Sequence, residues 1–125
     1  MYEKKRTVII CSRNVSKEVN DKIKAHVSAL EAKGWHVHWP TRDTKKNDTN
    51  GLEVCRQNRA AIYMAQEVHV WYESESQGSH FDIGMSFAFD LIRKRRWIII
   101  NKSDVKATPD KSFQNVLLAL DKASS

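Results

Sequence analysis

The sequence predicts an α/β fold, because four short apolar segments alternate with four longer amphipathic segments along the chain. Strands that alternate with helices form βαβ units, in which the strands are parallel and helices cover both faces of the sheet. We therefore expect a Rossmann- or flavodoxin-like three-layer sandwich with a parallel sheet of four or five strands, in the order 2-1-3-4 or 2-1-3-4-5. The 125 residues fit a single domain, residues 1–125.

The first strand–helix unit is predicted from an apolar run and a pair of helix-end signals. Residues 7–11 (TVIIC) are typical of a buried strand. Ser16 is a candidate N-cap for a helix that ends near Lys33, and Gly34 is expected to stop that helix.

The second unit begins with alternating residues and includes a long polar segment. Apolar and polar side chains alternate over residues 35–39, which predicts a half-buried strand ended by Pro40. Residues 41–50 (TRDTKKNDTN) are expected to form a mobile loop, either a lid over a site or a solvated connection. Residues 51–65 are predicted to form the second helix.

The second half of the chain predicts two more strands and two more helices. Residues 67–72 favour a buried strand, a polar turn follows at 73–78, and a helix is expected over 79–96 with Ser79 as its N-cap. Residues 97–101 (WIIIN) predict another buried strand, and 111–122 a last helix.

The helix predicted to begin at Ser79 is apolar on two sides. One stripe should pack on the sheet, and the other has no obvious cover in a monomer of this size. The stripes are Phe81, Met85, Ala88, Phe89 and Ile92 on one side, and Ile83, Phe87 and Leu91 on the other. We therefore expect a homodimer, or a multiple of it, in which this helix meets its copy.

Composition bounds the cellular context and the class of partner. The net charge of +6 and the pI near 9.4 allow an anionic partner. The basic residues cluster at 4–6, 45–46 and 93–96, and the last cluster is expected to close the helix that starts at Ser79. No nucleic-acid motif is recognised, so nucleic acid is not an expected partner.

No apolar run approaches a membrane span and no signal-peptide core is seen, so we expect a cytoplasmic protein without membrane contact.

Two polar loops are predicted to share one crevice. With the strand order 2-1-3-4, the sheet changes direction between the first and third strands, and ligands bind at the strand ends there. This brings residues 11–14 beside residues 73–82. Asp82 is the main candidate for chemistry in that crevice. The alternative is a capping box, Ser79-x-x-Asp82, in which Asp82 only caps the helix.

Residues 76–84 (SQGSHFDIG) resemble the S/D-x-G-x-x-x-E-L-G motif of the nucleoside 2-deoxyribosyltransferases, a family that includes deoxynucleoside 5′-monophosphate N-glycosidases. The order of the predicted elements agrees with this family over most of the chain. The resemblance implies that Asp82 is the nucleophile that attacks the anomeric carbon of a sugar and forms a covalent glycosyl-enzyme. The expected function is thus transfer or hydrolysis of the N-glycosidic bond of a (deoxy)nucleoside or its 5′-monophosphate.

Two departures from the family pattern keep a second interpretation open. Asp82 is one methylene shorter than the usual glutamate, and Gln57-Asn58-Arg59 stands where the family usually carries an aspartate that assists the leaving base. The alternative is a non-catalytic nucleotide-binding or sensor module on the same fold.

The resemblance also implies the ligand contacts. The expected substrate-binding residues are Cys11, Ser12, Arg13, Asn14, Trp39, Asn58, Glu73, Ser76, Gly78 and Ser79. Ordinary turn chemistry would also account for the Ser/Gly cluster, and a partly buried strand tryptophan for Trp39. Ser112 or Asn115 is expected to contribute to a neighbouring subunit's site. No cofactor is expected, and no metal, because the histidines lack metal-ligand spacing.

Overall fold

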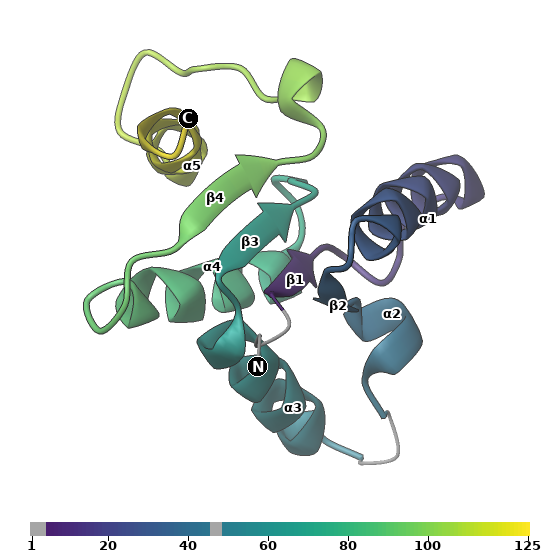
Figure 1. The fold of residues 1–125 in the computed structure, drawn as a ribbon. Helices are drawn as coiled ribbons and strands as arrows, with labels where there is room; N and C mark the ends of the chain where they lie inside the picture. Colours follow the sequence, from purple (N-terminus) through teal and green to yellow (C-terminus); the bar gives the residue numbers. More distant parts are fainter. Residues whose placement is uncertain (1–4, 46–48) are drawn as a thin grey trace.

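The computed structural model describes residues 5–45 and 49–125. The sheet contains β1 (Arg6–Ile10), β2 (His36–His38), β3 (Glu67–Val70) and β4 (Arg96–Ile99). All neighbouring strands pair in parallel in the order β2-β1-β3-β4, which confirms the predicted topology (Figure 1). The basic cluster at 4–6 and the polar segment 41–50 each lie partly outside the described residues.

Helices cover both faces of this sheet, as a parallel sheet requires. Figure 1 shows α1 on one side of the sheet, α3 and α4 together on the other, and α5 beside β4. The helices are α1 (Lys17–Ala32), α2 (Pro40–Asp43), α3 (Leu52–Met64), α4 (Gln77–Phe89) and α5 (Phe113–Ala123), with one 3-10 turn, η1 (Lys102–Asp104).

Two apolar cores result from the alternation of side chains along the strands. Val8 and Ile10 of β1 belong to the core shared with α3, α4 and α5, whereas Ile9 belongs to the core under α1. All three side chains are at most 1% exposed. Because successive strand residues point to opposite faces, one five-residue strand supports both layers.

The ends of α1 confirm the sequence prediction. The Ser16 hydroxyl accepts a hydrogen bond from the backbone N–H of Val19. At the other end, Gly34 adopts φ of +92°, the left-handed conformation in which glycine is favoured. The N–H of Trp35 then reaches back to the Leu30 carbonyl at 3.2 Å. This closure turns the chain directly into β2.

The segment after β2 is partly helical, which corrects the prediction that residues 41–50 form an irregular loop. Pro40–Asp43 form α2, and Pro40 stands at its first turn, where no backbone donor is needed. Residues 46–48 of the expected lid lie outside the described residues.

α4 begins earlier and ends earlier than the sequence predicts. Its N-cap is Ser76, not Ser79, because the Ser76 hydroxyl accepts the Ser79 N–H at 3.2 Å. Asp82 therefore lies in the second turn, beyond capping reach, so the alternative of a Ser79-x-x-Asp82 capping box does not hold. Gly78 lies in the first helical turn rather than in a tight turn, and a Cβ there would meet open space.

The basic cluster 93–96 lies beyond α4, which ends at Phe89. Arg95 is buried and donates to the Ser86 carbonyl in the last turn of α4 at 3.4 Å, as the prediction requires. It also donates to the carbonyls of Tyr63 and Ala65, so the cation complements the C-terminal ends of both α4 and α3.

The two predicted apolar stripes of α4 do not separate into a covered and an uncovered face. Ile83, Met85 and Phe89, which come from both stripes, pack on the core. The exposed apolar side chains also come from both stripes: Phe81, Phe87, Leu91 and Ile92, of which the last two follow the end of the helix.

The outer edge of β4 is covered by α5. The Trp97 N–H donates to the Ser124 hydroxyl and the Ile99 N–H to the Asp121 carboxylate, each at 2.8 Å. An edge strand exposes unpaired donors, and these two side chains accept them where a fifth strand would otherwise pair. The described sheet accordingly has four strands.

Candidate functional site

A cavity of about 750 Å³ lies at the carboxyl ends of β1 and β3. These two strands meet at the topological switch point of the 2-1-3-4 sheet, where ligands bind in open α/β folds. The two polar loops meet here, as predicted. The lining residues are Cys11, Ser12, Arg13, Asn14, Pro40, Thr41, Thr44, Gly51, Val54, Cys55, Asn58, Glu75, Ser76, Gln77, Gly78, Phe81 and Asp82.

Asp82 carries a carboxyl group with a raised pKa in the wall of this cavity. Burial raises the pKa of this carboxyl from 3.8 to about 6. No hydrogen bond or ion pair to Asp82 is seen among residues 5–45 and 49–125. The carboxyl is therefore ionised at neutral pH and has no partner in the described chain, the state required of a nucleophile or general base.

Cys11 is a less suitable nucleophile in the same cavity. Burial raises the pKa of its thiol, and the carboxylates of Glu73 and Asp82 act in the same direction. Because the thiolate is the reactive form, Cys11 is held in its unreactive state at neutral pH. Its side chain then serves as a packing surface beside Asp82.

The first turn of α4 supplies free backbone donors to the cavity. The N–H groups of Gln77 and Gly78 have no acceptor in the described part of the chain, and both residues line the cavity. Ser76 caps the helix and its hydroxyl donates to the Ser79 hydroxyl at 2.9 Å. Free amides at the positive end of a helix favour an anion at this end of the cavity.

The turn that carries this helix start is fixed by side chains. The Asn101 amide accepts the Tyr72 N–H at 2.8 Å and donates to the Tyr72 carbonyl at 2.9 Å. A nitrogen of His80 lies 2.7 Å from the Ser76 carbonyl. The start of α4 is thus held by Asn101, which follows β4, and by His80 of its own first turn, which limits its reorganisation on binding.

The loop after β1 faces the start of α4 across the cavity. The Ser12 hydroxyl accepts the Asn14 N–H at 3.1 Å and shapes the loop. Arg13 is exposed and forms no ion pair with any described residue. An unpaired guanidinium opposite free helix amides is suited to an anionic group such as a phosphate.

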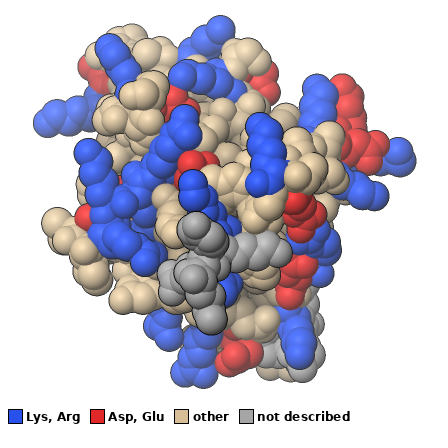
Figure 2. All heavy atoms as spheres, viewed as in Figure 1, with Lys and Arg blue, Asp and Glu red and all other residues tan. Residues whose placement is uncertain are grey.

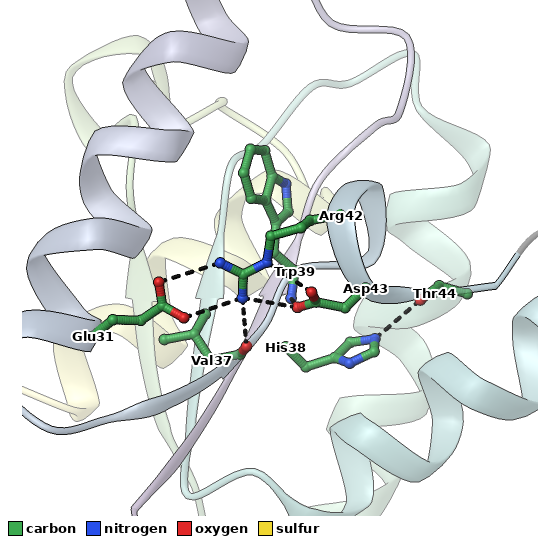
Figure 3. Close-up of polar contacts among 7 residues, drawn as sticks. All are labelled: Glu31, Val37, His38, Trp39, Arg42, Asp43 and Thr44. Carbon is green, nitrogen blue, oxygen red and sulfur yellow. Dashed lines mark hydrogen bonds and ion pairs between the residues drawn. The ribbon is translucent and has the colours of Figure 1, made fainter.

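The third wall comes from α2 and α3. Figure 3 shows Arg42 as the centre of the contacts that hold α2, with Glu31 of α1 on one side and Asp43 on the other. The guanidinium binds both Glu31 oxygens, at 3.1 and 3.2 Å, and the Val37 carbonyl at 3.1 Å. These contacts fix the position of Thr44, which follows α2 and lines the cavity.

The structure brings together most of the expected site residues. Asp82, Asn58, Ser76, Gly78 and the loop 11–14 all line the cavity. Three expected contacts lie outside its lining: Trp39, Glu73 and Ser79. Trp39 is buried in the core under α1, and Ser79 is buried next to Ser76.

The expected contributions to a neighbouring subunit have partners within the chain. The Ser112 hydroxyl caps α5 by accepting the Asn115 N–H, and the Asn115 side chain bonds to Thr108. Their role at a neighbour's site stays a prediction.

Sequence reasoning missed all of the α3 wall except Asn58. Gly51, Val54 and Cys55 line the cavity beside Asn58, and the spacing of i, i+3, i+4 and i+7 marks one helix face. That spacing was visible in the sequence. No group of three His, Cys, Asp or Glu that could hold a metal is found within the described ranges.

Comparison with known proteins supports the fold. No protein-family model matches the chain, and no curated protein shows significant sequence similarity to it. Among solved structures, the chain is similar to the CMP N-glycosidase BcmB of Clostridium botulinum, with a TM-score of 0.57 and 20% sequence identity. The match covers 82% of this chain and 100% of the other. At this identity the likeness establishes the α/β fold.

No helix in the described part of the chain is long and apolar enough to span a membrane.

Proposed function

We propose that the protein is an N-glycosidase, similar to the nucleoside 2-deoxyribosyltransferases, that acts on a (deoxy)nucleoside or its 5′-monophosphate. The observation that carries the proposal is the unpaired Asp82 carboxyl, with a pKa of about 6, in a cavity beside the free amides of α4. The fold shared with a CMP N-glycosidase and the motif in residues 76–84 point to the same chemistry.

In the proposed reaction the phosphate binds to the Gln77 and Gly78 amides and to Arg13. An Asp82 oxygen attacks the anomeric carbon, the bond from that carbon to the base nitrogen breaks, and the base leaves with the bonding electron pair. Water or a second base then attacks the same carbon and releases Asp82 as a carboxylate. Desolvation of Asp82 favours the attack, because burial makes the charge on the free carboxylate costly.

The acidity of Asp82 predicts the pH dependence of the reaction. The nucleophile must be ionised, so activity should rise as the pH passes about 6 and level off above pH 7. No carboxylic acid stands at position 58 to protonate the leaving base. The base therefore takes its proton from water or from another group in the cavity.

Loss of the carboxylate tests the proposal directly. Wild-type protein and Asp82→Asn are incubated with a panel of nucleosides, deoxynucleosides and their 5′-monophosphates, CMP included, and free base is measured by chromatography. We expect Asp82→Asn to lose ~10³-fold or more in turnover, since the nucleophile is removed. Asp110→Asn, in an exposed loop outside the cavity, is the matched control and should keep wild-type turnover. Turnover that survives in Asp82→Asn would refute the assignment.

A non-catalytic nucleotide-binding module is the second candidate. The amide of Asn58 favours it, because an amide cannot donate a proton to a leaving base as a carboxylic acid can. In this case the panel releases no base, while thermal shift still detects binding of the monophosphates.

We also propose that the chain forms a homodimer or a multiple of it. The exposed apolar side chains Phe87, Leu91 and Ile92, which are 54%, 93% and 70% exposed, favour a contact between copies. Phe87→Asp should shift the molecular mass from light scattering at micromolar concentration towards the monomer, because a charge cannot be buried there without cost. Ser28→Asp, on the exposed side of α1, introduces the same charge elsewhere and should leave the mass unchanged. A monomeric wild type would refute the proposal.

A further inference from the structure

A chain of three polar side chains ends at the α3 wall of the cavity. His38 of β2 lies with its Nε2 3.0 Å from the Thr44 hydroxyl, and that hydroxyl lies 2.7 Å from Oδ1 of Asn58. Thr44 and Asn58 are only 5% and 9% exposed, yet both line the cavity. Figure 3 shows the first of these contacts, between His38 and Thr44, beside the fixed helix α2.

The Thr44 hydroxyl has one proton, so the two hydrogen bonds of this chain run in the same direction. With the Asn58 amide oriented as in the structure, the hydroxyl donates this proton to Oδ1 of Asn58. It must therefore accept a hydrogen bond from His38, which places the imidazole proton on Nε2. Burial lowers the pKa of His38, so the ring is neutral and carries this one proton in a defined tautomer.

The orientation of the Asn58 amide follows from the same count. Its oxygen accepts the Thr44 proton, and the Asn58 side chain also interacts with His38. Among the described residues, no hydrogen bond is donated by its NH₂ group. This nitrogen is not among the fully buried atoms that lack a partner, so it reaches the surface of the cavity that Asn58 lines. There it is suited to bind an acceptor atom on a ligand.

The surroundings of Asn58 favour a flat ring over a phosphate. Val54 and Cys55, its neighbours on the same face of α3, are apolar, and Pro40 faces the cavity from α2. The free amides and Arg13 lie on other walls, at the start of α4 and after β1. A weakly polar wall with one donor matches the face and edge of a nucleobase.

We propose that His38 and Thr44 are positioning residues that orient the Asn58 amide, so that its NH₂ group binds a carbonyl oxygen or ring nitrogen of the base. The proposal rests on the proposed nucleotide-binding function of the cavity. With the NH₂ group facing the ligand, the site selects bases that present an acceptor atom at the edge nearest Asn58. The opposite tautomer of His38 would reverse the chain and present the amide oxygen to the ligand instead.

Ligands with and without a base provide the first test. Affinities for CMP and for ribose 5-phosphate are measured by calorimetry in wild type, Asn58→Ala, Thr44→Val and Thr44→Ser. Loss of one hydrogen bond should weaken CMP binding about 3- to 10-fold in Asn58→Ala and Thr44→Val. Ribose 5-phosphate, which has no base, should bind all four proteins equally, and Thr44→Ser should restore CMP binding because it keeps the hydroxyl.

The outcomes separate this proposal from the function on which it rests. If wild type binds neither ligand, the nucleotide-binding function fails. If it binds both, but Asn58→Ala and Thr44→Val weaken both equally or neither, the orientation of Asn58 towards the base is refuted.

The tautomer of His38 provides a second test that needs no ligand. ¹⁵N-detected NMR of the free protein should show His38 neutral with its proton on Nε2, and Thr44→Val should shift these signals while Thr44→Ser should not. A proton on Nδ1 in the wild type would overturn the proposed orientation, whatever the affinities show.

Discussion

Two carboxylates in this molecule, one buried and one partly buried, have opposite surroundings. Asp121 of α5 is 7% exposed, and its two oxygens accept from the Ile99 N–H at 2.8 Å and from the Lys102 ammonium at 2.6 Å. Asp82 of α4 is partly buried, and no described residue donates to it. Burial accordingly raises the pKa of Asp82 to about 6.

The difference shows which acid serves the fold. Asp121 accepts a strand amide that would otherwise be left unpaired at the edge of β4, and so it lowers the free energy of the folded state. Asp82 raises that free energy, because its charge is desolvated without compensation. A side chain that costs stability at a cavity wall indicates a site kept for a ligand.

The largest effect on stability is expected at Asp121. Asp121→Ala removes the acceptor of the Ile99 amide and the partner of Lys102, and should lower the free energy of unfolding by about 2–3 kcal/mol. Urea denaturation followed by circular dichroism measures this change. Asp110→Ala, in an exposed loop, is the control and should change stability by less than about 0.5 kcal/mol. An Asp121→Ala variant as stable as the wild type would show that Asp121 does not stabilise the folded state.

The sheet could be predicted from the sequence because its signals are local. Apolar runs of strand type and helix-end residues such as Ser16 and Gly34 lie within a few residues of the elements that they define. The strand order then follows from the short right-handed connections of parallel sheets. The cover of β4 by α5 could not be predicted, because it depends on the contact of Asp121 with an amide 22 positions away.

The start of α4 was misplaced for a similar reason. Ser76 and Ser79 are equally suitable caps by residue type. The turn before the helix is held by Asn101, which lies 29 positions from Tyr72 in the sequence, and this contact favours Ser76. Likewise, α2 is held by Arg42 through Glu31, on another helix.

The candidate site was predicted where the motif or the family resemblance marks it. Asp82, Ser76 and Gly78 belong to one short motif, and the switch point of the sheet brings the loop after β1 beside them. Thr44 could not be assigned, since it lies in a uniformly polar segment and its role depends on contacts with His38 and Asn58. Polar residues that act through such contacts leave no periodic pattern in the sequence.

Neutralising Asp82 itself should change stability with a sign opposite to that of the Asp121 substitution. The folded-state pKa of about 6 exceeds the ordinary value of 3.8, so ionisation disfavours the folded state. Asp82→Asn removes this cost and should raise the free energy of unfolding by ~1–3 kcal/mol at pH 7. The gain should shrink as the pH falls below 6, be small at pH 4 and vanish only below the ordinary pKa of 3.8, where the wild-type carboxyl is protonated in both states. Urea denaturation at pH 7, 5.5 and 4 measures it, with Asp110→Asn as control. A loss of stability at pH 7 would mean that Asp82 is held by the fold as Asp121 is, and the contrast between the two acids would be wrong.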